Sequence, residues 1–141
     1  MSDLLQALQP IAAIATALFA GLIAYQQKEI AAEKLKLEKF DRRFRVFDAT
    51  RRFLAHILRT GNVDPNAERD FWDAIGDACF LFDADIVTYL EDLRVRAIEF
   101  PAIDRQQIKW PEKRREAFEH FEKDIKTLHE RFGRFLALNQ R

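Results

Sequence analysis

The chain of 141 residues has few of the residues on which several classes of site depend. Cys79 is its only cysteine, so no internal disulfide can form and a reducing compartment suits the protein. Ser2 is the only serine and the four glycines are scattered, so neither a serine hydrolase nor a glycine-rich phosphate loop is indicated. One cysteine and three histidines do not make a familiar zinc cluster. No cofactor and no metal are therefore predicted.

The chain also lacks an excess of charge of either sign, since its formal net charge is zero. Such a balance gives no overall basic field for nonspecific nucleic-acid binding. The charges are nevertheless segregated: basic residues outnumber acidic ones by 10 to 5 in residues 28–59 and by 10 to 6 in residues 105–141, whereas residues 60–104 hold 3 basic and 11 acidic residues. We expect the acidic middle to pack beside the basic segments, within one protomer or between protomers. Attraction of the basic stem to anionic lipid is compatible with this.

An apolar segment runs from Leu4 to Tyr25 and is broken only by Gln6, Gln9 and Thr16. As a helix it would be roughly 33 Å long, close to the ~30 Å hydrocarbon core of a bilayer. Lysines and arginines follow it, and such residues mark the cytoplasmic side of a span. The sequence thus predicts a transmembrane anchor in residues 1–27 and a cytoplasmic domain in residues 28–141. The expected location is the bacterial inner membrane, crossed once, with the N-terminus outside. The alternatives are an apolar helix buried in an oligomer or one lying in the membrane surface.

Small residues recur at four-residue spacing within this segment and form two rows on one side of the expected helix. Small side chains let helix backbones approach closely in lipid. The pattern predicts self-association, although alanine is also common in short bacterial spans. The residues of the predicted oligomerisation surface are Ala13, Ala17 and Gly21 in one row and Ala12, Thr16, Ala20 and Ala24 in the other.

The periodicity of apolar residues predicts an all-α fold, because no window shows sustained two-residue alternation. One helix is expected to continue from the apolar segment to Thr60, followed by helices over about 65–82 and 83–100. Pro101 is expected to end the third helix, residues 102–110 to form a loop and Pro111 to open the last helix. The prediction is a four-helix cytoplasmic bundle whose first helix is continuous with the transmembrane helix.

Stripes of apolar residues mark the expected core. Arg51 occupies a position in the first stripe, where it would snorkel, pair with an acidic residue of the middle segment or face a site. Cys79 falls in an apolar run, which favours a buried, inert thiol. The first stripe is Leu37, Phe40, Phe44, Phe47, Leu54 and Leu58, and the last is Phe118, Phe121, Ile125, Leu128, Phe132 and Phe135.

Two arginine and histidine pairs have four residues between their members, Arg51 with His56 and Arg115 with His120. This spacing resembles the motif of the HEPN ribonucleases, in which an arginine is followed after four to six residues by a histidine. The resemblance implies that two protomers bring their pairs together into a metal-independent site that cleaves RNA through the ribose 2′-hydroxyl. An arginine can stabilise an anionic phosphorane while a histidine transfers protons. Arg115 and His120 are the candidate catalytic pair, with Arg51 and His56 as the second choice. The alternative is that Arg115 is a solvated residue of the first turn and that His120 is a surface histidine pairing with Glu116 or Asp124.

The predicted layout is also similar to that of membrane-anchored, HEPN-related accessory proteins of type VI RNA-guided phage defence. That similarity rests on the architecture and on Arg115 and His120 near the C-terminus. It implies oligomeric assembly and membrane permeabilisation rather than RNA cleavage.

Three functions follow as hypotheses. The first is a self-associating membrane protein that perturbs the bilayer or forms a pore in phage defence. The second is an HEPN-like ribonuclease, and the third is a membrane-anchored scaffold or adaptor. The expected partners are membrane lipid, further copies of the chain and a protein, with RNA implied only by the resemblance. No small-molecule substrate is evident, and the sequence favours a non-enzymatic role without deciding it.

Overall fold

A computed structural model describes residues 2–105, 109 and 111–137, with side chains from residue 13 onward. Over these residues the chain is helical and contains no strand, which confirms the predicted all-α class. Because α3 is a single turn, four longer helices carry the fold, as expected. The helices are α1 (Ser2–Thr60), α2 (Pro65–Ile75), α3 (Ala78–Leu81), α4 (Ala84–Arg105) and α5 (Pro111–Leu136).

Helix α1 is continuous over 59 residues, which confirms that the apolar segment and the charged stem form one helix. The predicted membrane span is wrong. Within the described part of the chain, no helix combines the length and the apolar character that crossing a bilayer requires. The physical reason is that the strictly apolar part covers only residues 11–25, whereas a span needs about 20 predominantly apolar residues. The single-pass inner-membrane location is overturned with it, and the membrane-perturbing role stays untested.

The chain divides into two compact units, Met1–Glu38 and Lys39–Arg141. The sequence predicts a boundary after residue 27, where the apolar segment ends. In the first unit all residues from Ala13 to Glu38 are exposed. The second unit holds a hydrophobic core, so the two units differ in how their apolar side chains are covered.

The core of the second unit is built largely from phenylalanine rings. Phe132 is fully buried, with its ring centroid 5.7 Å from Phe47 and 5.3 Å from Phe82. Phe53 stacks on Phe71 at 4.6 Å between centroids. The stripe predicted for the last helix is confirmed, since its residues are buried or half-buried in α5. The buried members are Phe121, Leu128, Phe132 and Phe135.

The buried face of α1 is rotated from the stripe expected for it. Thr50, not Arg51, lies in the core, and its hydroxyl donates to the carbonyl of Val46 at 2.7 Å. Phe44 is 45% exposed, although the pattern placed it in the stripe. Arg51 is exposed and pairs with Asp48 at 2.9 Å. Arg51 therefore lies at the surface beside a residue of its own helix and not with the acidic middle segment. Thr50 can take the core position because its hydroxyl bonds its own helix and leaves no buried donor unsatisfied.

The prediction of one helix over residues 65–82 is wrong, and so is the predicted burial of Cys79. Helix α2 ends at Ile75, and a new turn, α3, begins at Ala78. The interruption changes the angular phase of the residues that follow, so Ala78 enters the core while Cys79 is exposed. Phe80 is 82% exposed for the same reason.

The predicted stop at Pro101 is also wrong, since α4 continues to Arg105 with Pro101 inside it. Proline removes the bond from its own nitrogen to the carbonyl four residues earlier. Near the end of a helix this loss is tolerated when the preceding turn is held by packing. Ala97 and Phe100 are both fully buried, and the Phe100 ring lies 5.5 Å from that of Phe121.

The turn between α1 and α2 has the predicted stop and start signals. Gly61 takes a φ of 69°, and its amide donates to the carbonyl of Ile57 at 2.8 Å. The carboxylate of Asp64 caps α2 by accepting from the amides of Asn66 and Ala67 at 3.1 and 3.0 Å.

Replacing Asp64 by alanine is expected to lower the free energy of unfolding by about 1 kcal/mol, because two helix amides lose their acceptor. Urea titration followed by circular dichroism measures this. Asp70→Ala is the control, since it removes an equal charge from the exposed surface of α2. Equal losses in the two variants would contradict a capping role.

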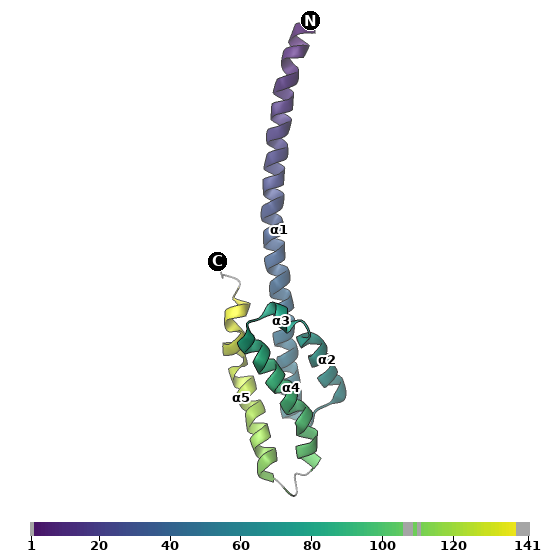
Figure 1. Cartoon of the computed structure of the whole chain (residues 1–141), viewed down its shortest axis with the longest axis vertical. Helices are drawn as coiled ribbons and strands as arrows, with labels where there is room; N and C mark the ends of the chain where they lie inside the picture. The colour runs from purple at the N-terminus through teal and green to yellow at the C-terminus, as the bar shows by residue number, and fades with distance from the viewer. Residues whose placement is uncertain (1, 106–108, 110, 138–141) are drawn as a thin grey trace. The chain divides into compact units, whose positions relative to one another are not determined.

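The predicted pairing of the acidic middle with the basic last segment is confirmed within one protomer. Helices α4 and α5 lie side by side (Figure 1). Arg114 Nε lies 2.6 Å from a carboxylate oxygen of Asp104, and Arg134 pairs with Asp85. Ion pairs therefore join both ends of α5 to α4.

Candidate functional site

The larger hollow is a groove of about 960 Å³ between the second half of α1 and α2. Its floor is apolar and includes Phe53 and Phe71. One wall of the groove carries basic side chains, and the opposite wall carries acidic side chains. The basic wall consists of Arg42, Arg45, Arg52, His56 and Arg59, and the acidic wall of Asp70, Asp73 and Asp77.

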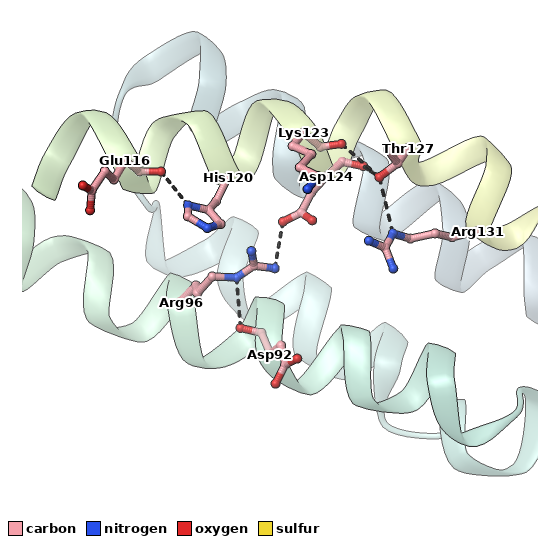
Figure 2. A network of polar contacts seen from close by, with 8 residues as sticks. All are labelled: Asp92, Arg96, Glu116, His120, Lys123, Asp124, Thr127 and Arg131. Atoms are coloured by element: carbon pink, nitrogen blue, oxygen red, sulfur yellow. Dashed lines mark hydrogen bonds and ion pairs between the residues drawn. The ribbon is translucent and has the colours of Figure 1, made fainter.

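A second hollow of about 540 Å³ lies between α4 and α5. Figure 2 shows its polar network, in which Arg96 of α4 reaches toward Asp124 of α5. His120 lies one helical turn before Asp124, and Lys123 and Arg131 belong to the same helix. We call these residues, together with Tyr89 of α4, the α4/α5 polar cluster.

Asp124 is the buried charge of this cluster, with only 4% of its surface exposed. Arg96 Nη2 lies 2.8 Å from its Oδ2 and forms an ion pair with it. Burial raises the pKa of the Asp124 carboxyl, an effect that Arg96, Arg131 and His120 oppose. The ion pair with Arg96 therefore compensates part of the buried charge.

The hydrogen bond of His120 determines the orientation of its ring. Nδ1 lies 2.7 Å from the carbonyl oxygen of Glu116, which can only accept, so Nδ1 carries the proton. In the neutral ring Nε2 then holds the lone pair.

Tyr89 is 6% exposed, and its hydroxyl has no hydrogen-bond partner among the described residues. Burial raises the pKa of Tyr89, so the group stays an uncharged O–H at every ordinary pH. The guanidinium of Arg131 lies 4.5 Å from the centroid of the Tyr89 ring. Arg131 Nε also donates to the hydroxyl of Thr127 at 3.3 Å. The tyrosine is therefore oriented by a cation while its own hydroxyl stays unsatisfied.

Within the chain, Arg115 and His120 do not converge. Positions five residues apart point about 140° away from each other around a helix. Arg115 is exposed and pairs with Glu112 at 2.7 Å and Glu119 at 3.6 Å, whereas His120 lines the α4/α5 hollow. The resemblance places such pairs across two protomers, so the ribonuclease role stays a prediction.

The second pair is separated in the same way. Arg51 pairs with Asp48, while His56 lines the groove between α1 and α2. Arg52 shares the carboxylate of Asp48 at 3.0 Å. Neither arginine and histidine pair forms a joint site within one protomer.

The predicted oligomerisation surface lies on α1. The side chain of Ala12 lies outside the described residues. The other members are exposed, and their role in assembly stays a prediction. They are Ala13, Thr16, Ala17, Ala20, Gly21 and Ala24.

Comparison with models of protein families, with curated proteins and with solved structures finds no match to this chain.

Sequence spacing did not single out four members of the α4/α5 polar cluster, namely Tyr89, Arg96, Lys123 and Arg131, and it indicated Asp124 only as a possible partner of His120. A signal was present. Tyr89 and Arg96 are seven residues apart, as are Asp124 and Arg131, so each pair shares one helix face. Asp124 also falls between Phe121 and Leu128 on a buried stripe, where an acidic residue requires a partner.

Proposed function

We propose that this protein is a self-associating helical scaffold whose N-terminal part of α1 joins copies of the chain. The observation that carries the proposal is a row of exposed apolar side chains at seven-residue intervals. Ile23, Ile30 and Leu37 are 43%, 64% and 56% exposed. A seven-residue apolar repeat is typical of helices that pair along a seam.

The unpacked state of this segment also supports pairing. From Ala13 to Glu38 every residue of α1 is exposed in the single chain. Most of the stability of helices comes from packing an apolar face, and isolated helices are marginal in water. A second copy would supply that packing and cover side chains whose burial is worth about 1.5–3 kcal/mol each when complete.

Charge favours a parallel arrangement of two copies. With Ile23, Ile30 and Leu37 at the first position of each heptad, Glu29 and Lys34 flank the seam on opposite sides. In a parallel pair, Glu29 of one copy would meet Lys34 of the other, which is the usual placement of interhelical ion pairs. The same contact forms twice in a symmetric dimer.

The residues at the second seam position of each heptad limit the affinity of one copy for another. Gln26 and Glu33 stand three residues after Ile23 and Ile30, where strong coiled coils carry leucine. Polar residues at such positions reduce stability while restricting the register. We therefore expect a dissociation constant on the order of micromolar, about 8 kcal/mol of association free energy.

Leu37→Asp is expected to shift the purified full chain from a concentration-dependent oligomer to a monomer, because it places a charge in the seam. Sedimentation equilibrium between about 1 and 100 µM brackets the expected constant. Leu35→Asp is the matched control, since Leu35 is 66% exposed on the same helix but lies outside the row. A monomeric wild-type chain over this range, or equal loss of mass in both variants, would contradict the proposal.

A scaffold of this kind presents several copies of the second unit. Each copy carries the groove between α1 and α2 with its basic and acidic walls. Multiplication of a binding surface raises its effective affinity without new contacts. Assembly would be the activity of the first unit and recognition that of the second.

A further inference from the structure

The hydroxyl of Tyr89 is a hydrogen-bond donor without an acceptor in the described part of the chain, and the residue is almost fully buried. It is buried beside the α4/α5 hollow, and no described residue accepts its hydrogen. Native proteins seldom leave a buried polar group unpaired, because its desolvation is then uncompensated. A group that enters the hollow with an acceptor oxygen would satisfy it.

Three cations line the hollow beside which Tyr89 lies. Arg131 lies over the Tyr89 ring, Arg96 beside Asp124, and Lys123 lines the same hollow. The cluster contains one buried carboxylate. The other acidic groups are turned elsewhere: Asp85 pairs with Arg134, and Figure 2 shows the Asp92 side chain directed away from α5. The interior of the hollow therefore favours an anion.

The two arginines have donors left for a ligand. A guanidinium has five N–H groups. Arg96 uses Nε on the carbonyl of Asp92 at 3.3 Å and Nη2 on Asp124, and Arg131 uses Nε on Thr127. The remaining N–H groups suit the tetrahedral oxygens of a phosphate, which arginine binds in bidentate fashion.

Asp124 adds a hydrogen-bond acceptor to a site whose arginines offer donors. Its Oδ2 faces Arg96 Nη2 at 2.8 Å, and because a carboxylate oxygen has a second lone pair it can also accept from a hydroxyl of the ligand. At about 540 Å³ the hollow has room for more than a bare ion, within the 300–1,000 Å³ typical of small-molecule sites. We infer that the α4/α5 hollow binds a small phosphate monoester, with its phosphate on Tyr89, Arg96 and Arg131 and a hydroxyl on Asp124.

Isothermal titration calorimetry of the full chain tests this with three probes: inorganic phosphate, glycerol 3-phosphate and adenosine 5′-monophosphate. We expect one of the monoesters to bind with a dissociation constant below about 1 mM and more tightly than inorganic phosphate. Tyr89→Phe should weaken that binding about fivefold by removing one hydrogen bond, and Arg131→Gln tenfold or more by removing a charged one.

Two controls separate the site from general attraction and from misfolding. Arg115→Gln removes an arginine of α5 that lies outside the hollow, and it should leave the affinity unchanged. Tyr89→Phe should melt at or above the wild-type temperature, because the hydroxyl it removes has no partner. Absence of binding for all three probes at 10 mM overturns the inference. So does equal weakening by Arg115→Gln and Arg131→Gln, or stronger binding of inorganic phosphate than of either monoester.

Discussion

Replacing Phe132 by alanine is expected to lower the free energy of unfolding of the second unit by about 4 kcal/mol. The Phe132 ring is fully buried and contacts both Phe47 of α1 and Phe82 beside α3. Its removal leaves a cavity at the point where segments distant in sequence meet, and close-packed interiors relax only partly around such a cavity. Guanidinium unfolding followed by far-UV circular dichroism measures the loss.

Phe80→Ala is the matched control for this change. Phe80 is 82% exposed, so the same truncation removes little packing, and a change within about 0.5 kcal/mol is expected. If the two phenylalanine variants were equally destabilised, the side chain of Phe132 would not be part of the core as described.

Arg96→Met is expected to destabilise the fold by about 3 kcal/mol at neutral pH, because it leaves the buried carboxylate of Asp124 without its nearest cation. The loss should shrink toward pH 4. The folded-state pKa of Asp124 lies above its ordinary value, and the variant raises it further. A carboxyl with a raised folded pKa stabilises the fold at low pH and loses that contribution as pH rises through the folded pKa. Urea titrations of both proteins across this range give the difference directly.

A second substitution separates charge burial from simple loss of packing. In Arg96→Met with Asp124→Leu no buried charge remains, so most of the lost stability should return. Arg115→Met is the control for removing an arginine, and since its ion pairs are exposed it should cost less than about 1 kcal/mol. A double variant as unstable as Arg96→Met would show that the charge of Asp124 is not the cause.

The parts of the fold that sequence predicted best are those where local signals agree with packing. In α5, apolar residues keep one period from Phe118 to Phe135, and the helix follows it without a break. At Gly61 and Asp64 the stop and the cap use residues with strong conformational preferences. Local chemistry and tertiary burial favour the same conformation at these positions.

The failures arise where tertiary contacts decide between local alternatives. The spacing of apolar residues places Arg51 and Cys79 on apolar stripes, whereas the residues buried in the core are Thr50 and Ala78. Pro101 is a strong local stop, yet the buried turn before it carries α4 onward. The membrane prediction for the start of α1 was based on the length of the segment from Leu4 to Tyr25, although the uninterrupted apolar part of that segment is short.

The α4/α5 polar cluster could not be assembled from spacing alone. Its members come from two helices, and the pairing of Arg96 with Asp124 depends on how α4 and α5 align. Sequence spacing joined His120 to Arg115 on one helix, whereas folding surrounds it with Arg96 and Asp124. Polar residues at seven-residue intervals indicate which face of their own helix they share. They do not indicate which other helix packs against that face.

The exposed thiol of Cys79 has a practical consequence. As the only cysteine of the chain, it offers one chemically unique attachment point without any engineering. A maleimide fluorophore there would report the proximity of copies by energy transfer between identical dyes. The same thiol can oxidise between two molecules and produce a covalent dimer unrelated to α1. Masses measured without a reductant would mix these two species, whereas the alkylated protein reports only the noncovalent one.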